Sequence, residues 1–357
     1  MITERKMKVR NRPKVLLGMS GGVDSSVAAY ILKKDGYEVI GCTMELWTGE
    51  NHKKSNIEDA KRVAEILQIP FHIFDLQKEF KEYVIKYFIS EYEAGRTPNP
   101  CVACNRYVKF QGLLDKAQEL NIDYVATGHY ANIEKGDERY YLKKAVDESK
   151  DQTYFLYKLT PEQLSKTIFP LGNYKKTEIR DIAKKLGFEV AEKPDSQEVC
   201  FVENNNHYEF VKQYSHNDMK KGEIVDIDGN VLGYHEGISK YTIGQRRGLG
   251  VVTGKPMFVI DIYGESNRVI LGSNEDLFKK ELVVENLNWI YLDSPKEEMT
   301  LKVKIRSTAS EVESKVIPNG KEAKVVFSKP QRAITKGQSA VFYKDDYVVG
   351  GGVIKSS

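Results

Sequence analysis

A glycine-rich turn near the start of the chain has the residue types of an anion-binding loop. It follows an apolar run, Val15 to Leu17, precedes a segment with helical spacing, and reads SGGVDSS over residues 20–26. Glycines let the backbone approach a phosphate closely, and the first amides of a helix point toward a bound anion. The loop lacks the P-loop pattern GxxxxGKS or GxxxxGKT, so it holds no lysine for a γ-phosphate. We therefore expect a nucleotide site that favours cleavage between the α- and β-phosphates.

Four cysteines are the other residues suited to covalent chemistry: Cys42, Cys101, Cys104 and Cys200. Cys42 lies in the apolar segment VIGCTMELW, where a buried structural thiol is expected. The scattered positions exclude a disulfide framework, and without an apolar leader before them we expect a reducing cytoplasm. In that compartment a cysteine within a motif suggests catalysis or metal binding. A zinc knuckle is disfavoured because the CxxC pair of Cys101 and Cys104 has no second pair nearby.

Alternating strand-like and helix-like segments surround these residues. The strand-like segments are 15–17, 37–47, 71–76 and 123–131, and the helix-like segments are 26–34, 55–68 and 177–186. Ser55 and Glu58 fit a capping box at the start of the second of these helices. Alternation of this kind is typical of an α/β domain with a mainly parallel sheet, which we expect over residues 14–209.

The periodicity changes to short alternating runs beyond about residue 210, which predicts an all-β region. We divide it into a small central domain over 210–275, rich in glycine around YTIGQRRGLG, and a C-terminal β-barrel domain over 276–357. Residues 1–13 form a basic tail. Barrels of this kind often bind nucleic acids or small ligands, although a fold alone does not prove a function.

The composition limits the classes of function. The chain has 357 residues with 54 Lys and Arg against 51 Asp and Glu, a net charge of +3. This balance excludes an acidic disordered protein and a histone-like basic one, so any nucleic-acid site must be a local patch. Lys240, Tyr241, Arg246 and Arg247 form one such candidate patch. No apolar run approaches the ~20 residues of a membrane helix, so we expect no membrane association.

Six further motifs narrow the interpretation of the loop. They are TPNPCVACN at 97–105, TGHYA at 127–131, KDQTYFL at 150–156, DSQEVCF at 195–201, YTIGQRRGLG at 241–250 and GQSAVFY at 337–343. Together with SGGVDSS they resemble the tRNA-specific 2-thiouridylase family (MnmA or TrmU), within the ATP pyrophosphatase superfamily. The resemblance runs from residue 14 to the C-terminus. It implies an α/β PP-loop domain like the adenine nucleotide alpha hydrolases, followed by the central and barrel domains.

The resemblance implies a tRNA sulfurtransferase. Such an enzyme adenylates the C2 oxygen of the wobble uridine (position 34) with ATP, then transfers sulfur from a cysteine persulfide, releasing AMP and pyrophosphate. Cys200 matches the persulfide-bearing cysteine, and Cys104 matches the second catalytic cysteine, with a Cys104–Cys200 disulfide as the product that external thiols reopen. Mg²⁺ is the expected partner of the phosphates. The implied ATP-binding residues are Gly18, Met19, Ser20, Gly21, Gly22, Val23, Asp24, Ser25, Met44 and Gly128.

Cys101 departs from the family pattern, because many members have an aspartate at this position. Three interpretations stay open. Cys101, Cys104 and Cys200 could hold a 4Fe–4S cluster with one open iron site; Cys101 could be a spare resolving thiol; or it could be a tolerated small residue.

The implied partner is tRNA, with uridine extruded from the anticodon and the Glu, Gln and Lys acceptors as substrates. The matching RNA-contacting positions are Asn99, Pro100, Cys101, His129, Lys150, Asp151, Gln152, Arg306 and Gln338. A cysteine desulfurase or a sulfur-relay protein must supply sulfur, and a monomer is expected. Two other classes compete: a different AMP-forming PP-loop enzyme, which needs no paired cysteines, and a non-catalytic RNA-binding protein, which needs no intact loop.

Overall fold

The computed structural model describes residues 12–47, 55–192, 199–202, 204, 206–215, 217, 220–252 and 254–357. Most of the basic tail predicted over 1–13 lies outside the described residues. So do residues 195–198 of the DSQEVCF motif and the side chain of Ser55 in the predicted capping box. Cys200 itself is described.

A five-stranded sheet forms the centre of the N-terminal part. Its order is β3-β2-β1-β4-β7, and every neighbouring pair is parallel. The strands are β1 (Lys14–Gly18), β2 (Glu38–Glu45), β3 (Phe71–Asp75), β4 (Tyr124–Thr127) and β7 (Thr167–Ile168). The helices of this part that match the predicted ones are α1 (Val23–Lys34), α2 (Ser55–Leu67) and α9 (Lys176–Lys185). The predicted parallel sheet is confirmed, although α1 begins inside the glycine motif rather than at Ser26.

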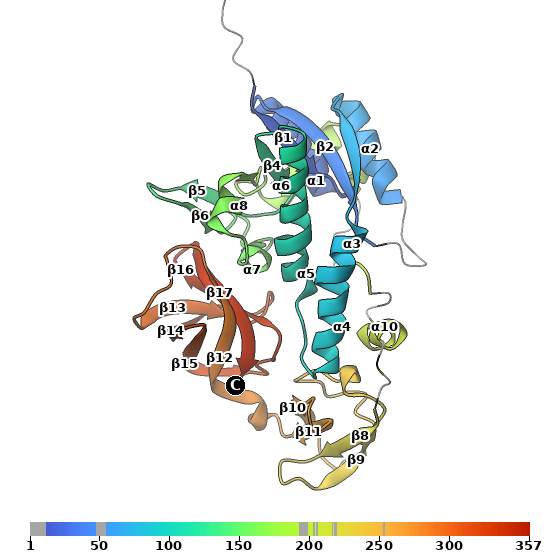
Figure 1. Ribbon diagram of the computed structural model, residues 1–357, viewed down its shortest axis with the longest axis vertical. Helices are drawn as coiled ribbons and strands as arrows, with labels where there is room; N and C mark the ends of the chain where they lie inside the picture. The colour runs from blue at the N-terminus through green and yellow to red at the C-terminus, as the bar shows by residue number, and fades with distance from the viewer. Residues whose placement is uncertain are drawn as a thin grey trace, which may run out of the picture.

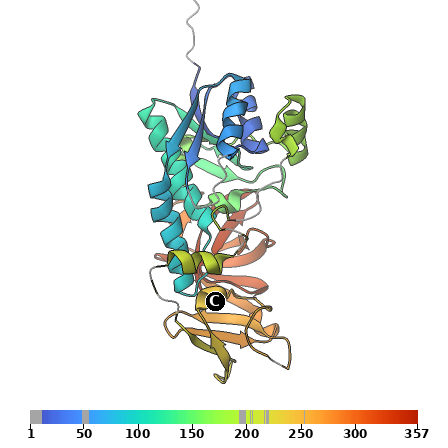
Figure 2. The ribbon, with the colours of Figure 1, turned by 90° about the vertical axis from the view of Figure 1, so that its right-hand side faces the viewer.

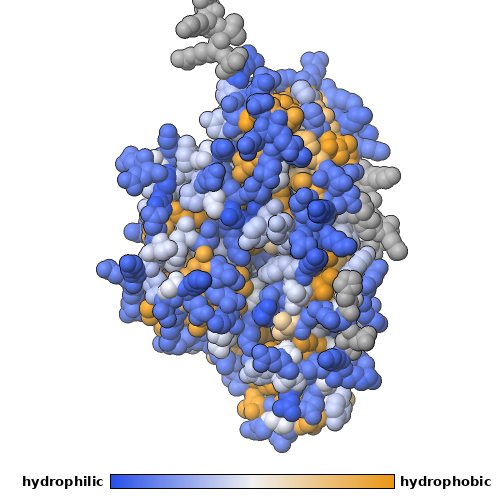
Figure 3. Space-filling view, viewed as in Figure 1, coloured by the Kyte–Doolittle hydropathy of each residue, from blue (hydrophilic) through white to orange (hydrophobic). Residues whose placement is uncertain are grey.

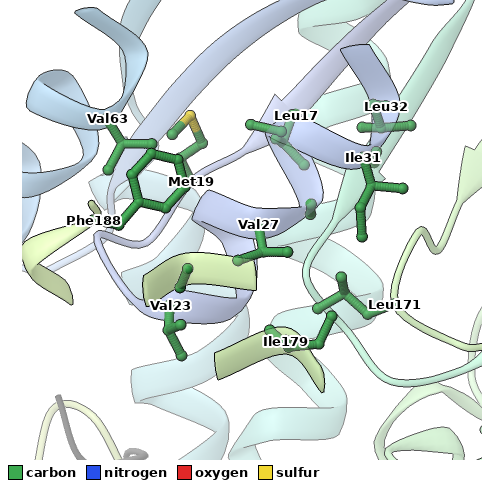
Figure 4. Packing of buried hydrophobic residues seen from close by; sticks show 14 of the residues in the cluster. Leu17, Met19, Val23, Val27, Ile31, Leu32, Val63, Leu171, Ile179 and Phe188 are labelled. Atoms are coloured by element: carbon green, nitrogen blue, oxygen red, sulfur yellow. The ribbon is translucent and has the colours of Figure 1, made fainter. Parts of the chain in front are cut away.

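Both faces of this sheet are covered, which explains the uninterrupted apolar run in β1. Leu17 belongs to a buried cluster with α1 and α9, in which Val27 and Ile179 are fully buried (Figure 4). Leu16 points to the other face and packs with Leu113. Each fully buried aliphatic side chain of this kind contributes roughly 1.5–3 kcal/mol of transfer free energy, so the two faces together fix β1. The phosphate loop leaves the end of this strand.

Two helical segments that pack against each other, together called the rod here, extend downward from the sheet in Figure 1. One half contains α3 (Gln77–Phe80), the π-helix η1 (Lys81–Ile85) and α4 (Lys86–Glu93). The other half contains α5 (Pro100–Ala103), the π-helix η2 (Cys104–Phe110) and α6 (Gln111–Glu119). The two π-helical segments contact each other. Sequence periodicity did not predict this rod, which carries Cys101 and Cys104.

Six antiparallel strands close into the predicted C-terminal barrel, because the first strand also pairs with the last. They are β12 (Phe278–Trp289), β13 (Met299–Lys304), β14 (Val312–Asn319), β15 (Glu322–Arg332), β16 (Ser339–Lys344) and β17 (Tyr347–Ser356). A hairpin of the N-terminal part, β5 (Asn132–Lys135) and β6 (Tyr140–Lys143), extends the barrel sheet through the pair Tyr347 and Lys143. The hairpin therefore links the barrel to the parallel-sheet domain.

The central part is a four-stranded sheet, seen at the lower end of Figures 1 and 2. Its strands are β8 (Gly222–Val225), β9 (Val231–His235), β10 (Phe258–Tyr263) and β11 (Arg268–Gly272). The helix α10 (His207–Tyr214) precedes them, so the β structure starts about ten residues later than the sequence suggested. Among the described residues, the other short helices are α7 (Thr153–Leu156), α8 (Pro161–Ser165), η3 (Glu189–Glu192), η5 (Ile238–Lys240) and η6 (Glu275–Leu277).

The surface drawn in Figure 3 is mainly hydrophilic, with hydrophobic residues gathered only in small patches. Within the described residues, the longest apolar helices fall short of what crossing a membrane requires.

Candidate active site

The phosphate loop is fixed by its neighbours and open at its tip. The Met19 amide donates to the Cys42 carbonyl at 2.7 Å, and the Thr43 hydroxyl donates to the Met19 carbonyl at 2.7 Å. The Ser20 amide donates to Ser25 Oγ at 3.1 Å, which folds the loop back on the first turn of α1. No side chain caps the N-terminus of α1 at Gly22, and Ser20 in the loop is exposed to solvent. The amides at this end are thus available to an anion.

A lysine from a distant helix lies at this loop. Lys176, the first residue of α9, donates to both carboxylate oxygens of Asp24 at 2.7 and 2.8 Å. The Tyr130 hydroxyl donates to Asp24 Oδ1 at 2.8 Å. Lys176 is 7% exposed, so its charge is nearly removed from water. The loop therefore has a cation after all, supplied from 152 residues away.

We expect Lys176→Met to lower the free energy of unfolding by about 3 kcal/mol, because it leaves the Asp24 carboxylate without its cation. Adding Asp24→Asn should restore part of that loss, since the uncompensated charge is removed as well. Urea denaturation of the two single variants and the double variant measures the coupling. Strictly additive effects would show that the ion pair does not contribute.

Gly128 and Met44, which the resemblance implies as ATP-binding residues, lie next to the loop. A Cβ atom at Gly128 would lie 2.7 Å from the Ser25 amide nitrogen, so the turn after β4 is in direct contact with the start of α1. The Met44 methyl group lies 3.4 Å from the position of a Cβ at Gly18. These contacts lie at the carboxyl edge of the parallel sheet, where ligands of such sheets bind.

The segment TPNPCVACN is held by the barrel. The Gln338 side chain donates to the carbonyls of Thr97 and Pro98 at 3.0 and 3.1 Å, and the Thr97 amide donates to the Lys336 carbonyl at 2.8 Å. Asn99 caps α5, with its Oδ1 accepting from the Val102 amide at 3.4 Å. These bonds fix where α5 starts and hence where its cysteines lie.

Cys104 and Cys200 come together through aromatic packing. Cys104 is buried in a cluster that includes Phe201, and Phe201 packs on the rings of Phe80 and Phe88 at 5.5 and 5.1 Å. Phe201 thereby anchors its neighbour Cys200 beside the rod, and Cys200 and Cys101 are both exposed. All three thiols interact electrostatically with Lys109. Burial raises the pKa of Cys104 to about 12, and Lys109 opposes that effect.

His129 lies between the two halves of the site. It follows Gly128, its Nδ1 is 2.7 Å from Thr127 Oγ1, and its ring is 5.8 Å from that of Phe110 and 6.2 Å from that of Phe169. Burial, reinforced by the charge of Lys109, lowers the pKa of His129 to about 3. The imidazole is therefore neutral at physiological pH and can take part in hydrogen bonds without carrying a charge.

This depressed pKa predicts a pH dependence of stability. Between pH 6.5 and about 3 the unfolded chain binds a proton at this histidine and the folded chain does not, so stability falls as pH falls. Wild-type protein should lose up to about 1.4 kcal/mol per pH unit more than His129→Gln over this range. Urea unfolding at pH 7, 6 and 5 measures this difference, with His72→Gln, at an exposed position, as the control. Parallel pH profiles for wild type and His129→Gln would refute the assignment.

The other predicted RNA-contacting residues are spread over three parts of the fold. Asp151 accepts from the Ala145 amide at 3.0 Å, and Gln152 Oε1 accepts from the Tyr130 amide at 2.9 Å. Lys150, next to them, is partly buried. Arg306 donates to Thr335 Oγ1 at 2.8 Å within the barrel. Pro100 is buried at the start of α5, and Arg246 and Arg247 of the basic patch are exposed.

Sequence reasoning missed Lys176 and Lys109. Lys176 stands in an ordinary amphipathic helix, and only the tertiary fold brings it to Asp24. Lys109 follows Cys104 by five residues, a spacing that would separate the two on an α-helix. The signal that could have found Lys109 is a lone lysine among the apolar residues of VKF, directly after the cysteine motif.

Three family models match consecutive parts of the chain. Residues 13–204 match the tRNA methyl transferase HUP domain, 208–273 the tRNA methyl transferase PRC-barrel domain, and 279–354 the aminomethyltransferase beta-barrel domain. The tRNA-specific 2-thiouridylase MnmA of Clostridioides difficile (strain 630) is 52% identical over 96% of this chain and 98% of its own length. The chain belongs to the tRNA-specific 2-thiouridylase family.

Further members of this family agree. MnmA 2 of Clostridium tetani (strain Massachusetts / E88) is 51% identical and MnmA of Clostridium beijerinckii 50%, covering 96% and 97% of this chain and 99% of each relative. The family inferred from the seven motifs is thus confirmed. Among solved structures, a 4-thiouridine synthetase–RNA complex with bound ATP matches with a TM-score of 0.36 and 20% identity, over 56% of this chain and 50% of that one.

Proposed function

We propose that this protein is a tRNA 2-thiouridylase that adenylates the C2 oxygen of the wobble uridine and replaces it with sulfur carried by Cys200. One observation carries the proposal. The turn after β4 contacts the phosphate loop through Gly128 and, one residue later, His129 interacts with Lys109, which interacts with all three cysteines. Residues 128 and 129 thus connect the phosphate loop to the group of three thiols. The relatives named above carry the same activity in their names.

The chemistry requires both halves of this site. An oxygen on a conjugated ring leaves poorly as hydroxide, so attack of the C2 oxygen on the α-phosphate of ATP, with release of pyrophosphate, turns it into an ester of AMP. The first amides of α1 would hold the phosphates. Mg²⁺ would be held mainly by the phosphates themselves, because the Asp24 carboxylate already pairs with Lys176.

Sulfur transfer then needs two thiols. The outer sulfur of a Cys200 persulfide attacks C2, and AMP leaves with the oxygen. The Cys104 thiolate attacks Sγ of Cys200, so that the Cys104–Cys200 disulfide forms and the sulfur–sulfur bond to the base breaks. The electron pair of that bond stays with the 2-thiouridine. An external thiol reduces the disulfide and restores the enzyme.

A 4Fe–4S cluster does not fit the present arrangement. Across the described parts of the chain, no three His, Cys, Asp or Glu side chains converge as a metal site requires. We derive no step through a cluster. Iron and acid-labile sulfide assays on protein purified without oxygen test this point, and a cluster whose removal abolishes thiolation would replace the two-thiol scheme.

Several finer assignments belong to the proposal. The substrates are tRNAs for Glu, Gln and Lys, the sulfur comes from a cysteine desulfurase or a relay protein, and the enzyme acts as a monomer in the cytoplasm. We keep the domain division at 14–209, 210–275 and 276–357. The exposed residues Arg246 and Arg247 support RNA binding through a local basic surface, whose affinity falls as salt rises.

One assay tests the proposal against its competitors. The protein is incubated with ATP, Mg²⁺, a persulfide donor and unmodified tRNA, and the products are analysed for 2-thiouridine and AMP. We expect both products in equal amounts. AMP without 2-thiouridine would indicate a different AMP-forming enzyme, and neither product would indicate an RNA-binding protein without catalysis.

A further inference from the structure

Lys109 is a partly buried cation in a site that otherwise carries thiols. Of the described groups, those that interact with its charge are Cys104, Cys101, Cys200 and the neutral His129, and none of them is a carboxylate. A buried ammonium group is normally paired with an anion, because removing a lone charge from water is costly. Among these described groups, the ones that can become that anion are the sulfurs.

The backbone explains how Lys109 reaches them. Residues 104–110 form the π-helix η2, in which hydrogen bonds join residues five apart. Cys104 and Lys109 are separated by five residues, so the π-helix brings them to one face. In an α-helix the residues aligned with Cys104 would lie three and four positions later. The neighbouring α5 adds Cys101, and the anchor formed by Phe201 adds Cys200.

We propose that Lys109 is a functional residue of sulfur transfer, the cation that stabilises the sulfur anion at Cys200, Cys104 and Cys101 as the reaction passes from one to the next. This inference rests on the proposed function and adds a residue to it. The outer sulfur of the persulfide attacks as an anion, and Cys104 attacks as a thiolate. Both steps therefore place a negative charge within the field of one ammonium group.

Energetics show why such a cation is needed. Burial raises the pKa of Cys104 to about 12. Partial desolvation by the surrounding protein also raises the pKa values of Cys101 and Cys200, whose side chains still reach solvent, while Lys109 acts in the opposite direction on all three. An opposite charge at close range favours the ionised form of a group by about 1–3 pKa units. Lys109 would thus increase the thiolate population at neutral pH about tenfold or more.

The pH dependence of alkylation tests this role without relying on activity. Iodoacetamide labelling of the exposed Cys101 and Cys200 is followed by peptide mass spectrometry from pH 6 to 10 in the full-length protein. Lys109→Met keeps the unbranched stem and removes the charge, Lys109→Gln is a second neutral variant, and Lys109→Arg keeps the charge. Lys116→Met is the matched control, because Lys116 lies further along the same rod and pairs with Glu119.

The two neutral variants should raise the labelling midpoint of Cys200 and Cys101 by about one pH unit or more, whereas Lys109→Arg and Lys116→Met keep that of wild type. Single-turnover thiolation by the neutral variants should be about tenfold slower at pH 7 and approach wild type as the pH rises. Unchanged midpoints, or a thiolation deficit that is the same at every pH, would overturn the inference. Failure of the proposed function would give a different result from failure of this inference. If the proposed function were wrong, Cys200→Ser would still thiolate tRNA, whatever the labelling midpoints of the Lys109 variants.

Discussion

Replacing Cys200 or Cys104 with serine should lower the rate of 2-thiouridine formation by about a thousandfold or more, because a serine oxygen can neither carry a sulfane sulfur nor resolve it. Cys200→Ser should still release pyrophosphate in a first turnover, since the adenylation half of the site is intact. Quantification of 2-thiouridine in digested tRNA, together with pyrophosphate release, measures the two steps separately.

The other two cysteines provide matched controls. Cys42 is fully buried in the sheet, beside Leu16 and Leu113, so Cys42→Ala should change stability and not thiolation. Cys101→Ser should cause a partial loss of thiolation. Cys101 interacts electrostatically with Lys109, but no step of the two-thiol scheme requires its thiol. Equal and complete loss in Cys101→Ser, Cys104→Ser and Cys200→Ser would contradict the two-thiol scheme and favour a cluster.

Gly128→Ala should lower kcat/KM for ATP by about a hundredfold, since a displacement of about 1 Å at a reacting group has an effect of that size. The added Cβ would lie 2.7 Å from the Ser25 amide nitrogen and 2.9 Å from the Asp24 carbonyl carbon, so the phosphate loop itself must move. Pyrophosphate release as a function of ATP concentration measures the effect.

Gly36→Ala is the matched control for this variant. Gly36 lies past the other end of α1, where an added Cβ meets no atom within 4 Å. Its φ of 92° makes the alanine strained, so stability should fall by about 1 kcal/mol while kcat/KM for ATP stays at the wild-type value. An unchanged kcat/KM in Gly128→Ala would show that the turn after β4 does not shape the nucleotide site.

The sheet and the barrel could be predicted from sequence because their signals are local. The continuous apolar residues of β1 and the alternating runs after β11 each reflect the faces that a strand buries. The π-helices were not predictable in this way, because an extra residue in one turn leaves little trace in hydrophobic spacing. The hairpin of β5 and β6 was missed because its partner, β17, comes about two hundred residues later in the chain.

The candidate site likewise has parts that the sequence predicts and parts that only the tertiary structure shows. The phosphate loop and the cysteines could be found because their motifs are short and contiguous. The pairing of Lys176 with Asp24 and the field of Lys109 arise only when distant elements meet. Gln338 was predicted to contact RNA, and in the structure its amide group donates to the carbonyls of Thr97 and Pro98. The prediction of RNA contact at Gln338 stays a prediction.

Tracing the oxygen of the target base tests the central claim most directly. An anticodon stem-loop carrying oxygen-18 at C2 of the wobble uridine is converted in a single turnover with ATP and persulfide-loaded protein, and the AMP is analysed by mass spectrometry. The account predicts that the label appears in the phosphate of AMP, one atom for each 2-thiouridine formed. Unlabelled AMP accompanied by 2-thiouridine would contradict it, because the oxygen would then have left without forming an ester with the nucleotide.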